Sequence, residues 1–379
     1  VGKARYQPSE HALTQFILNY GKRRFHGHRV GSPDWVEEDY EYGGRLTQAL
    51  ELAEGNTLRF GGLYNQWKTP TGKRFYAGNP GDLETYSGMI SDEQQIGDLT
   101  VEGTYRYTRT YVDQFGGFNV EGSPRGGLRS VMVENEWEDP LQTFNLGASY
   151  ALTDLTSLHG NIQYGEIGAR PGMLDTDLEM PDTETRIKYD VGIKRSWNEF
   201  GEVDLSLFYV DQQDAPLASR QTVIVEGDPY VLFENADRDN YGIELDTRTR
   251  RFDNGLQGFF NTVVMQSRRT QGGDWTDDVE TPDVIIGGGA SYLILENLDL
   301  SAWLKHVAPY RNQRFAAGSD RIGLGNFTEL NTKLTYFWGE ENQHEVYFAV
   351  DNITDREYST VVGWPNEGRT YRVGLGMTW

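Results

Sequence analysis

The sequence contains no cysteine, and its hydrophobic residues never gather into a long run. The absence of cysteine among 379 residues excludes disulfides, thiolate zinc sites and cysteine nucleophiles. A membrane-spanning helix needs roughly 18 consecutive apolar residues, and no segment approaches that length. These two absences exclude a helical membrane protein and any chemistry that depends on a thiol.

Positive charge is also scarce. The chain has 35 Lys and Arg against 57 Asp and Glu, which gives a net charge of −22. Because a nucleic-acid binder needs a basic face, we exclude nucleic acid as a partner. The excess of carboxylates is typical of solvated loops and hydrated internal surfaces. A loop surface that holds cations is the alternative interpretation.

Aromatic residues are abundant, although the mean hydropathy is low. They make up 13% of the chain at a mean hydropathy of −0.62, so they must be placed selectively. The last segment shows how, because large residues occupy every second position and small or polar residues lie between them. The large residues are Tyr371, Val373, Leu375, Met377 and Trp379. In a wide β-barrel the large face meets lipid and the other face meets a watery lumen.

The same alternation recurs about sixteen times along the chain, with turn residues between the runs. Tight turns are predicted at 153–154, 199–201, 253–255 and 296–297, and long polar connections at 114–127, 168–184, 212–229, 268–283 and 308–327. Short turns alternating with long loops are typical of outer-membrane barrels. The sequence therefore predicts an all-β fold, a transmembrane antiparallel barrel of the outer-membrane type that occupies residues 1–379.

Several motifs in 145–379 resemble those of the TonB-dependent outer-membrane receptor barrels. The resemblance is carried by residues in this order: Leu152-Thr153-Asp154, Arg170-Pro171, Glu184-Thr185, Asn235-Ala236, Gly242-Ile243-Glu244-Leu245, Val350-Asp351-Asn352-Ile353-Thr354-Asp355-Arg356-Glu357-Tyr358 and Gly368-Arg369-Thr370-Tyr371-Arg372-Val373-Gly374-Leu375. Residues 1–144 fit as strands with little motif content.

The resemblance implies an energised importer in the bacterial outer membrane that takes up a bulky, scarce nutrient, above all a ferric siderophore. It implies a 22-stranded barrel, an N-terminal plug and contact with the TonB complex. Neither the plug nor a TonB-contacting box is found in the 379 residues. We therefore expect this chain to be the C-terminal part of such a barrel, without its plug and first strands. Further expected partners are outer-membrane lipid, lipopolysaccharide and the barrel-insertion machinery.

Two other functions remain open from the sequence. The strand number suits a passive 16-stranded porin, and enzymes built on outer-membrane barrels exist. No Ser lies in a nucleophile elbow, and no His, Asp and Glu set has the spacing of a zinc or hydrolase site. We therefore expect no catalytic residue, no metal and no cofactor. His26 and His28 share a face, but Arg24 and Arg29 flank the pair, which favours a solvated loop.

Five residues in or beside the long connections are candidates for ligand binding. Their rings and guanidinium could stack on a siderophore or bind its carboxylates, although we favour an interfacial aromatic girdle as the explanation of the aromatic residues. The candidates are Trp275, Tyr310, Arg311, Phe315 and Trp364. A second set, Tyr371, Val373, Leu375 and Trp379, resembles the C-terminal signal that the barrel-insertion machinery recognises.

Overall fold

The computed structural model describes residues 1–27, 35–70, 81–116, 130–197, 199–271, 273–312, 322–361 and 364–378. Within these ranges every regular element is a β-strand, as the alternation predicts. None of the described residues belongs to a helix long and apolar enough to cross a membrane. The chain divides into two compact units, one of residues 1–149, 161–189 and 210–238 and one of residues 150–160, 190–209 and 239–379.

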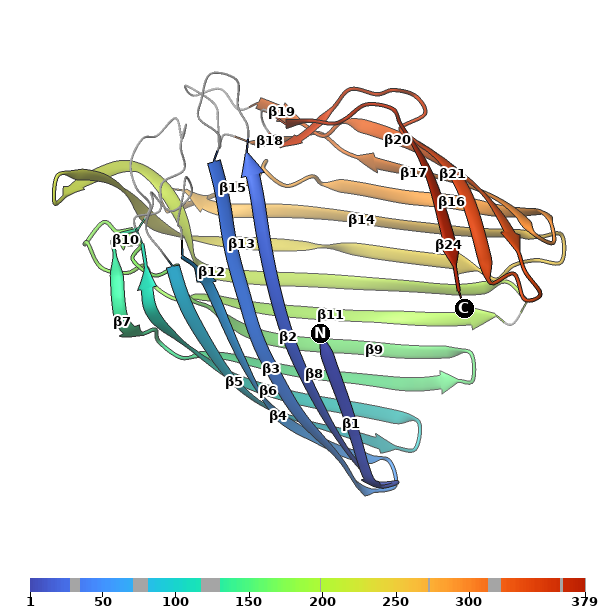
Figure 1. Cartoon of the computed structure of the whole chain (residues 1–379), viewed down its shortest axis with the longest axis horizontal. Helices are drawn as coiled ribbons and strands as arrows, with labels where there is room; N and C mark the ends of the chain where they lie inside the picture. The colour runs from blue at the N-terminus through green and yellow to red at the C-terminus, as the bar shows by residue number, and fades with distance from the viewer. Residues whose placement is uncertain are drawn as a thin grey trace. The chain divides into compact units, whose positions relative to one another are not determined.

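The first unit begins with a series of antiparallel hairpins, drawn in blue and cyan in Figure 1. Each strand from β1 to β6 pairs with the next along the chain, and β6 also pairs with β7. The bounds are β1 (Gly2–Ser9), β2 (Ala12–Gly27), β3 (Trp35–Ala53), β4 (Asn56–Thr69), β5 (Gly81–Ile96), β6 (Leu99–Phe115), β7 (Val133–Trp137) and β10 (Leu174–Asp175).

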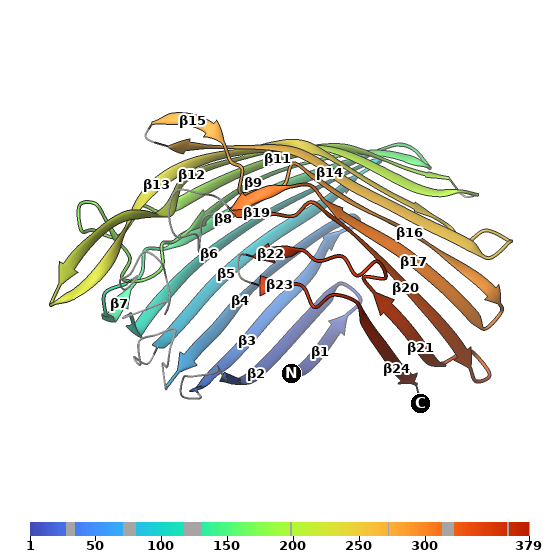
Figure 2. The ribbon, with the colours of Figure 1, turned by 90° about the horizontal axis from the view of Figure 1, so that it is seen from above.

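The second unit contains the later hairpins. Antiparallel pairing runs from β14 through β16, β17, β20 and β21 to β24, as Figure 2 shows in yellow to red. The bounds are β14 (Leu256–Gln271), β15 (Asp274–Asp277), β16 (Val284–Leu295), β17 (Leu298–Val307), β18 (Tyr310–Asn312), β19 (Ile322–Leu324), β20 (Phe327–Trp338), β21 (His344–Asp351), β22 (Ser359–Val361), β23 (Trp364–Pro365) and β24 (Thr370–Met377).

Five long strands have residues in both units. They are β8 (Leu141–Thr153), β9 (Thr156–Ile167), β11 (Glu184–Trp197), β12 (Gly201–Val225) and β13 (Asp228–Thr249). With these included, seventeen strands of the described chain have eight or more residues. That number agrees with the sixteen or so runs of alternating residues in the sequence.

The predicted tight turns all fall at strand boundaries, and the Asp253-Asn254-Gly255 turn shows why. Gly255 has a φ of +84°, in the left-handed region that L side chains avoid. Its N–H donates to the carbonyl of Phe252 at 2.8 Å, and a Cβ at Gly255 would lie 2.9 Å from the carbonyl oxygen of Leu293. Only glycine therefore closes this turn without strain.

The long strands expose their large apolar residues on one face. In β24 the exposed fractions of Tyr371, Val373 and Leu375 are 62%, 76% and 66%. In β12, Leu205 and Leu207 are 41% and 52% exposed. A soluble protein would bury this face in a dry core, and the exposure agrees with the prediction that these large residues do not pack in one. We call this side of the strands the apolar face and the opposite side the polar face.

The predicted long connection at 212–229 is wrong. β12 continues to Val225 and β13 begins at Asp228, so the strands extend through the segment to a two-residue turn. Glu226 and Gly227 have φ values of +52° and +96°, the conformation of a tight hairpin turn. The runs on either side of the turn are rich in β-branched and aromatic residues, which favour strand, and Leu232 and Phe233 are buried.

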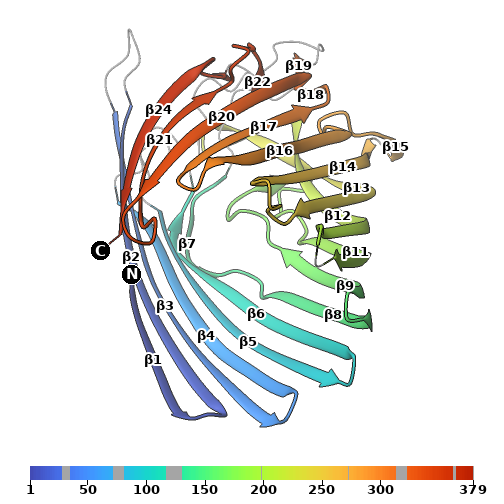
Figure 3. The same ribbon diagram turned by 90° about the vertical axis from the view of Figure 1, so that its right-hand side faces the viewer.

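Two other predicted long connections contain more strand than the sequence indicates. Within 268–283, β14 continues to Gln271 and lies beside β15 (Figure 3). Thr270 is opposite Trp275 in the register of this pair. Within 308–327, β18 and β19 form a short antiparallel ribbon. The connection at 168–184 is irregular apart from β10, as predicted, and 114–127 lies mostly outside the described residues.

A charge on the apolar face tests the assignment of that face to lipid. We expect Val373→Arg to lower the free energy of unfolding in lipid vesicles by about 2–4 kcal/mol, because a lipid-facing Arg is costly near the midplane. Glu345→Arg, on the polar face of the neighbouring strand β21, is the matched control and should cost less. Equal losses, measured by urea titration, would contradict the assignment.

The turn at Gly255 provides a second test. Gly255→Ala should destabilise the protein by at least about 1 kcal/mol in the same titration, because alanine resists positive φ and its Cβ would crowd Leu293. Gly103→Ala in β6 is the control, since a Cβ there meets no atom within 4 Å. A Gly255→Ala protein as stable as the Gly103→Ala protein would show that the turn tolerates a side chain.

Candidate functional site

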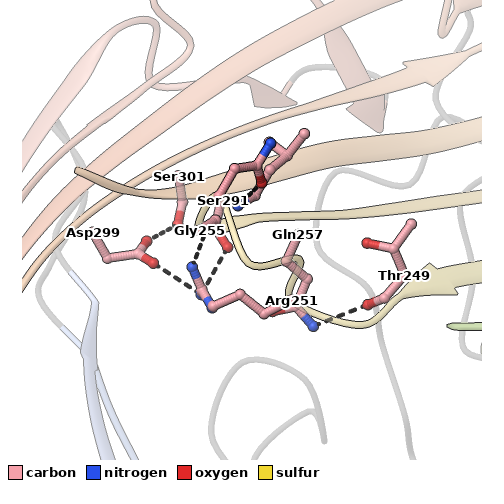
Figure 4. A network of polar contacts seen from close by, with 9 residues as sticks. Thr249, Arg251, Gly255, Gln257, Ser291, Asp299 and Ser301 are labelled. Atoms are coloured by element: carbon pink, nitrogen blue, oxygen red, sulfur yellow. Dashed lines mark hydrogen bonds and ion pairs between the residues drawn. The ribbon is translucent and has the colours of Figure 1, made fainter. Parts of the chain in front are cut away.

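A guanidinium between β13 and β14 organises part of the polar face of the second unit (Figure 4). The Arg251 Nη1 donates to the carbonyl of Gly255 at 2.8 Å, and Nη2 donates to Ser291 Oγ at 3.1 Å and Asp299 Oδ2 at 3.0 Å. Ser301 Oγ donates to the other carboxylate oxygen of Asp299 at 2.9 Å. Three segments of the chain are thus linked by one cation and one carboxylate.

Strand register explains why these groups meet. Ser291 on β16 lies directly opposite Ser301 on β17, and Asp299 shares the polar face with Ser301 because it lies two residues away. Leu300, between them, is on the apolar face and is 40% exposed. The Asp299 side chain is only 12% exposed. Removal of Arg251 would therefore leave a largely desolvated carboxylate without its charged partner.

A second ion pair lies on the polar face of β21 and β24. Arg372 contacts both carboxylate oxygens of Asp351, with Nε 2.6 Å from Oδ2 and Nη2 2.8 Å from Oδ1. Lys333 Nζ lies 4.3 Å from the ring centroid of Tyr347 on the neighbouring strands. Val373, adjacent to Arg372, is on the apolar face. On the polar face, an ion pair therefore links β24 to β21, and a cation–π contact links β20 to β21.

Tyr358, in the connection between β21 and β24, folds back over the start of β20. Its ring stacks on Phe327 with centroids 3.7 Å apart and planes 8° apart. Its hydroxyl donates to Glu329, on the same strand as Phe327. Burial and this hydrogen bond raise the pKa of Tyr358 to about 12.

The long connections of the second unit are tied to one another. The Arg269 side chain is 7% exposed and lies 3.8 Å from Asp278 Oδ1 and 3.7 Å from Glu280 Oε1. The backbone N–H of Arg311 donates to the carbonyl of Val279 at 2.7 Å. These contacts join the segment after β15 to β18.

Tyr310 extends this arrangement to a third connection. Its hydroxyl donates to the carbonyl of Thr360 in β22 at 2.8 Å, and the N–H of Gly325 donates to the carbonyl of Ser359 at 3.3 Å. Burial raises the pKa of Tyr310 above its ordinary value. We call the joined set the loop cluster; it consists of Arg269, Asp278, Val279, Glu280, Tyr310, Arg311 and Thr360.

Two of the five candidate ligand-binding residues, Tyr310 and Arg311, lie together in the loop cluster, and the Arg311 side chain is exposed. Phe315 lies outside the described residues, as does the side chain of Trp364. A ligand role for all five stays a prediction.

Trp275 lies elsewhere. The Arg268 guanidinium sits between two rings, 5.4 Å from the centroid of Trp275 and 5.6 Å from that of Tyr241. Arg268 also pairs with Asp239 at 2.7 Å, and Asp239 accepts a hydrogen bond from Tyr209 at 2.9 Å. Tyr209 continues the apolar row of β12. This placement favours the interfacial girdle for Trp275, the second interpretation that the sequence allows.

The remaining candidates are the histidine pair and the C-terminal row. The side chain of His26 is exposed, and His28 lies outside the described residues. Across the ranges that the structure describes, no three His, Asp or Glu side chains are arranged to hold a metal ion. Tyr371, Val373 and Leu375 share the exposed face predicted for the assembly signal, whereas Trp379 is not among the described residues.

Three of these contacts leave no sign in the sequence. Arg251 and Asp299 are 48 residues apart, and Tyr358 and Glu329 are 29 apart. Arg269 and its two carboxylates fall within a segment predicted as an irregular loop. Alternation places Asp299 on the polar face, but it does not identify Arg251, in the turn before β14, as its partner.

The sequence matches the family described as "TonB dependent receptor-like, beta-barrel" over residues 2–353. The match includes residues 2–144, which carry little motif content, and ends before the closing-strand motif at 368–375. Comparison with curated proteins gives no match.

Three solved structures share the fold. The FrpB iron transporter from Neisseria meningitidis has a TM-score of 0.72 at 14% identity, covering 96% of this chain and 60% of its own. The ferric-catecholate import receptor Fiu from Escherichia coli K12 has a TM-score of 0.73 at 12% identity, covering 99% and 63%. The copper transporter OprC has a TM-score of 0.71 at 14% identity, covering 98% and 63%.

At such low identities the TM-scores show the fold alone, and this chain spans between 60% and 63% of the three solved chains. The family match covers nearly all of the sequence and confirms the resemblance drawn from its motifs. The protein belongs to the TonB-dependent receptor β-barrel family.

Proposed function

We propose that this chain forms barrel wall and external loops of an outer-membrane receptor that imports a bulky, scarce nutrient, of which a ferric siderophore is the best candidate. The observation that carries the proposal is the loop cluster, where three long connections are fixed to one another around Tyr310 and Arg311. Family membership supplies the class of transporter.

The loop cluster has the chemistry that a bulky anionic complex requires. Arg311 is exposed, while its backbone is held by Val279, so the guanidinium stands on an anchored segment. An Arg can bind carboxylate or phenolate oxygens through two parallel hydrogen bonds. Tyr310 beside it offers a ring of fixed position because its hydroxyl is bonded to Thr360. Anchoring before binding reduces the entropy lost when a ligand is held.

The names of the three solved structures support a metal complex as the class of nutrient. Their names identify an iron transporter, a ferric-catecholate import receptor and a copper transporter. All three names refer to a metal, and two of the three refer to iron. Together with the exposed Arg311, which suits an anionic ligand, these names support a ferric chelate as the nutrient.

The two faces of the strands support a position in the outer membrane. The apolar face would contact lipid and lipopolysaccharide, and the polar face, with Arg251 and Asp299, would contact water or a plug. The barrel-insertion machinery would recognise the end of the chain through Tyr371, Val373 and Leu375. The TonB complex would deliver energy through a plug, as the family resemblance implies.

Dependence on TonB separates this function from a passive channel. In a strain that lacks its own iron receptors, the full-length protein should support uptake of radioactive iron from a ferric siderophore. The same strain without TonB should show no uptake, because an energised receptor cannot release its ligand unaided. Uptake that persists without TonB, together with entry of small sugars, would identify a porin and overturn the proposal.

The role of the loop cluster is tested by Arg311→Ala in the full-length protein. We expect binding of a ferric siderophore to weaken by about 10-fold or more, because a charge-assisted hydrogen bond contributes about 1.5–3 kcal/mol. Arg195→Ala, an exposed Arg in β11 close to the tight turn at 199–201, is the matched control. Equal affinities for the two variants, measured by fluorescence quenching, would exclude Arg311 from the site.

A further inference from the structure

The apolar face of the first unit contains a groove of about 730 Å³. Its floor is formed by three glycines on neighbouring strands: Gly44 on β3, Gly62 on β4 and Gly88 on β5. Gly62 lies directly opposite Gly88 in the strand register. The same row continues with Leu46 on one side and Tyr107 on the other, so the floor interrupts a line of large side chains.

The backbone does not require glycine at these floor positions. A Cβ at Gly88 would meet no atom within 4 Å, and at Gly62 the nearest atom would be 3.7 Å away. Gly61, on the polar face, differs because a Cβ there would lie 2.4 Å from the carbonyl of Leu46. Crowding by the backbone thus requires glycine at position 61. At positions 62 and 88 the effect of glycine is to leave the groove open.

An aromatic wall and a cation stand at one end of the groove. The rings of Tyr64 and Tyr86 have centroids 5.1 Å apart, and those of Tyr86 and Trp137 are 5.7 Å apart. Arg109 lies opposite Tyr86 in the register, with its guanidinium 4.9 Å from the Trp137 ring centroid. This end is nearer the long connection that follows Phe115 than the tight turn before Leu99.

Arg109 carries a positive charge that no carboxylate of the described residues contacts. Within the described part of the chain, its guanidinium contacts the Trp137 ring and the backbone carbonyl of Glu138, the latter at 3.3 Å from Nε. The side chain is exposed. An uncompensated guanidinium among interfacial aromatic residues has the charge and the hydrogen-bond donors to bind a phosphate oxygen.

We infer that the groove holds one acyl chain of a membrane lipid whose phosphate contacts Arg109. The inference rests on the part of the proposed function that places the apolar face in a membrane. The aromatic wall marks the level at which hydrocarbon meets headgroups. An acyl chain lying over Gly62 and Gly88 would then have its phosphate beside Arg109. A second protein copy would cover the glycine floor with side chains, but it would not explain the position of the cation.

Native mass spectrometry of the full-length protein in detergent, titrated with dipalmitoyl phosphatidylglycerol, tests the inference. We expect one tightly bound lipid. A Gly62→Leu, Gly88→Leu double variant should weaken that binding at least about 10-fold by filling the groove without crowding the backbone. Gly103→Leu, on the same face of β6 with open space around it, is the control and should bind as the wild type does.

The headgroup contact is tested separately with Arg109→Gln and with dipalmitoylglycerol, which has the same acyl chains and no phosphate. Arg109→Gln should weaken binding of the phosphatidylglycerol about 10-fold and leave binding of the dipalmitoylglycerol unchanged. Arg106→Gln, on the opposite face of β6, is the control and should change neither.

Equal lipid binding by the wild type and the groove-filling variant would overturn the inference. So would a wild-type dimer that becomes monomeric when the groove is filled, because the occupant would then be a second copy of the chain. Iron uptake is measured independently of lipid binding. A protein that imports iron but binds no lipid in the groove would therefore refute this inference and leave the proposed function intact.

Discussion

The fold depends on the separation of side chains by the two faces of each strand. A strand places alternate residues on opposite sides, and this chain uses that property to expose large apolar groups on one side. On the other side are charges, which would be costly in hydrocarbon and are held in pairs such as Arg251 with Asp299 and Arg372 with Asp351. A shift of one residue in register would exchange the two sets, so the ion pairs and the apolar rows specify the same register.

This separation also explains which parts of the fold can be predicted from sequence. The alternation along 369–379 is enough by itself to identify both faces of β24. Asn254-Gly255 is likewise enough to identify the tight turn before β14. The hairpin at Glu226-Gly227 escapes prediction because Asp, Gln and Pro in 212–229 resemble a loop. In the folded chain those residues belong to β12 and β13, which extend beyond their rows of large apolar residues. Polar residues are compatible with strand in these extensions.

The candidate site is less predictable, for a physical reason. Tyr310 and Arg311 can be selected by residue type, but their neighbours Val279 and Thr360 contribute backbone carbonyls, which leave no signature in a sequence. Trp275 can be selected as a ligand contact by its residue type. In the structure, however, its ring contacts Arg268, which also contacts Tyr241, close to the apolar row of Tyr209. The glycine floor of the groove likewise becomes informative only when the space around Gly62 and Gly88 is known.

Contact between the apolar face and hydrocarbon can be measured directly, because the sequence contains no cysteine. Single cysteines can be introduced in turn from Tyr371 to Met377, spin-labelled, and tested in bilayers for collision with oxygen and with a water-soluble nickel chelate. We predict a period of two, with labels at Tyr371, Val373 and Leu375 accessible to oxygen and shielded from nickel. Labels at these positions that collide freely with nickel, or that collide with neither reagent, would contradict it.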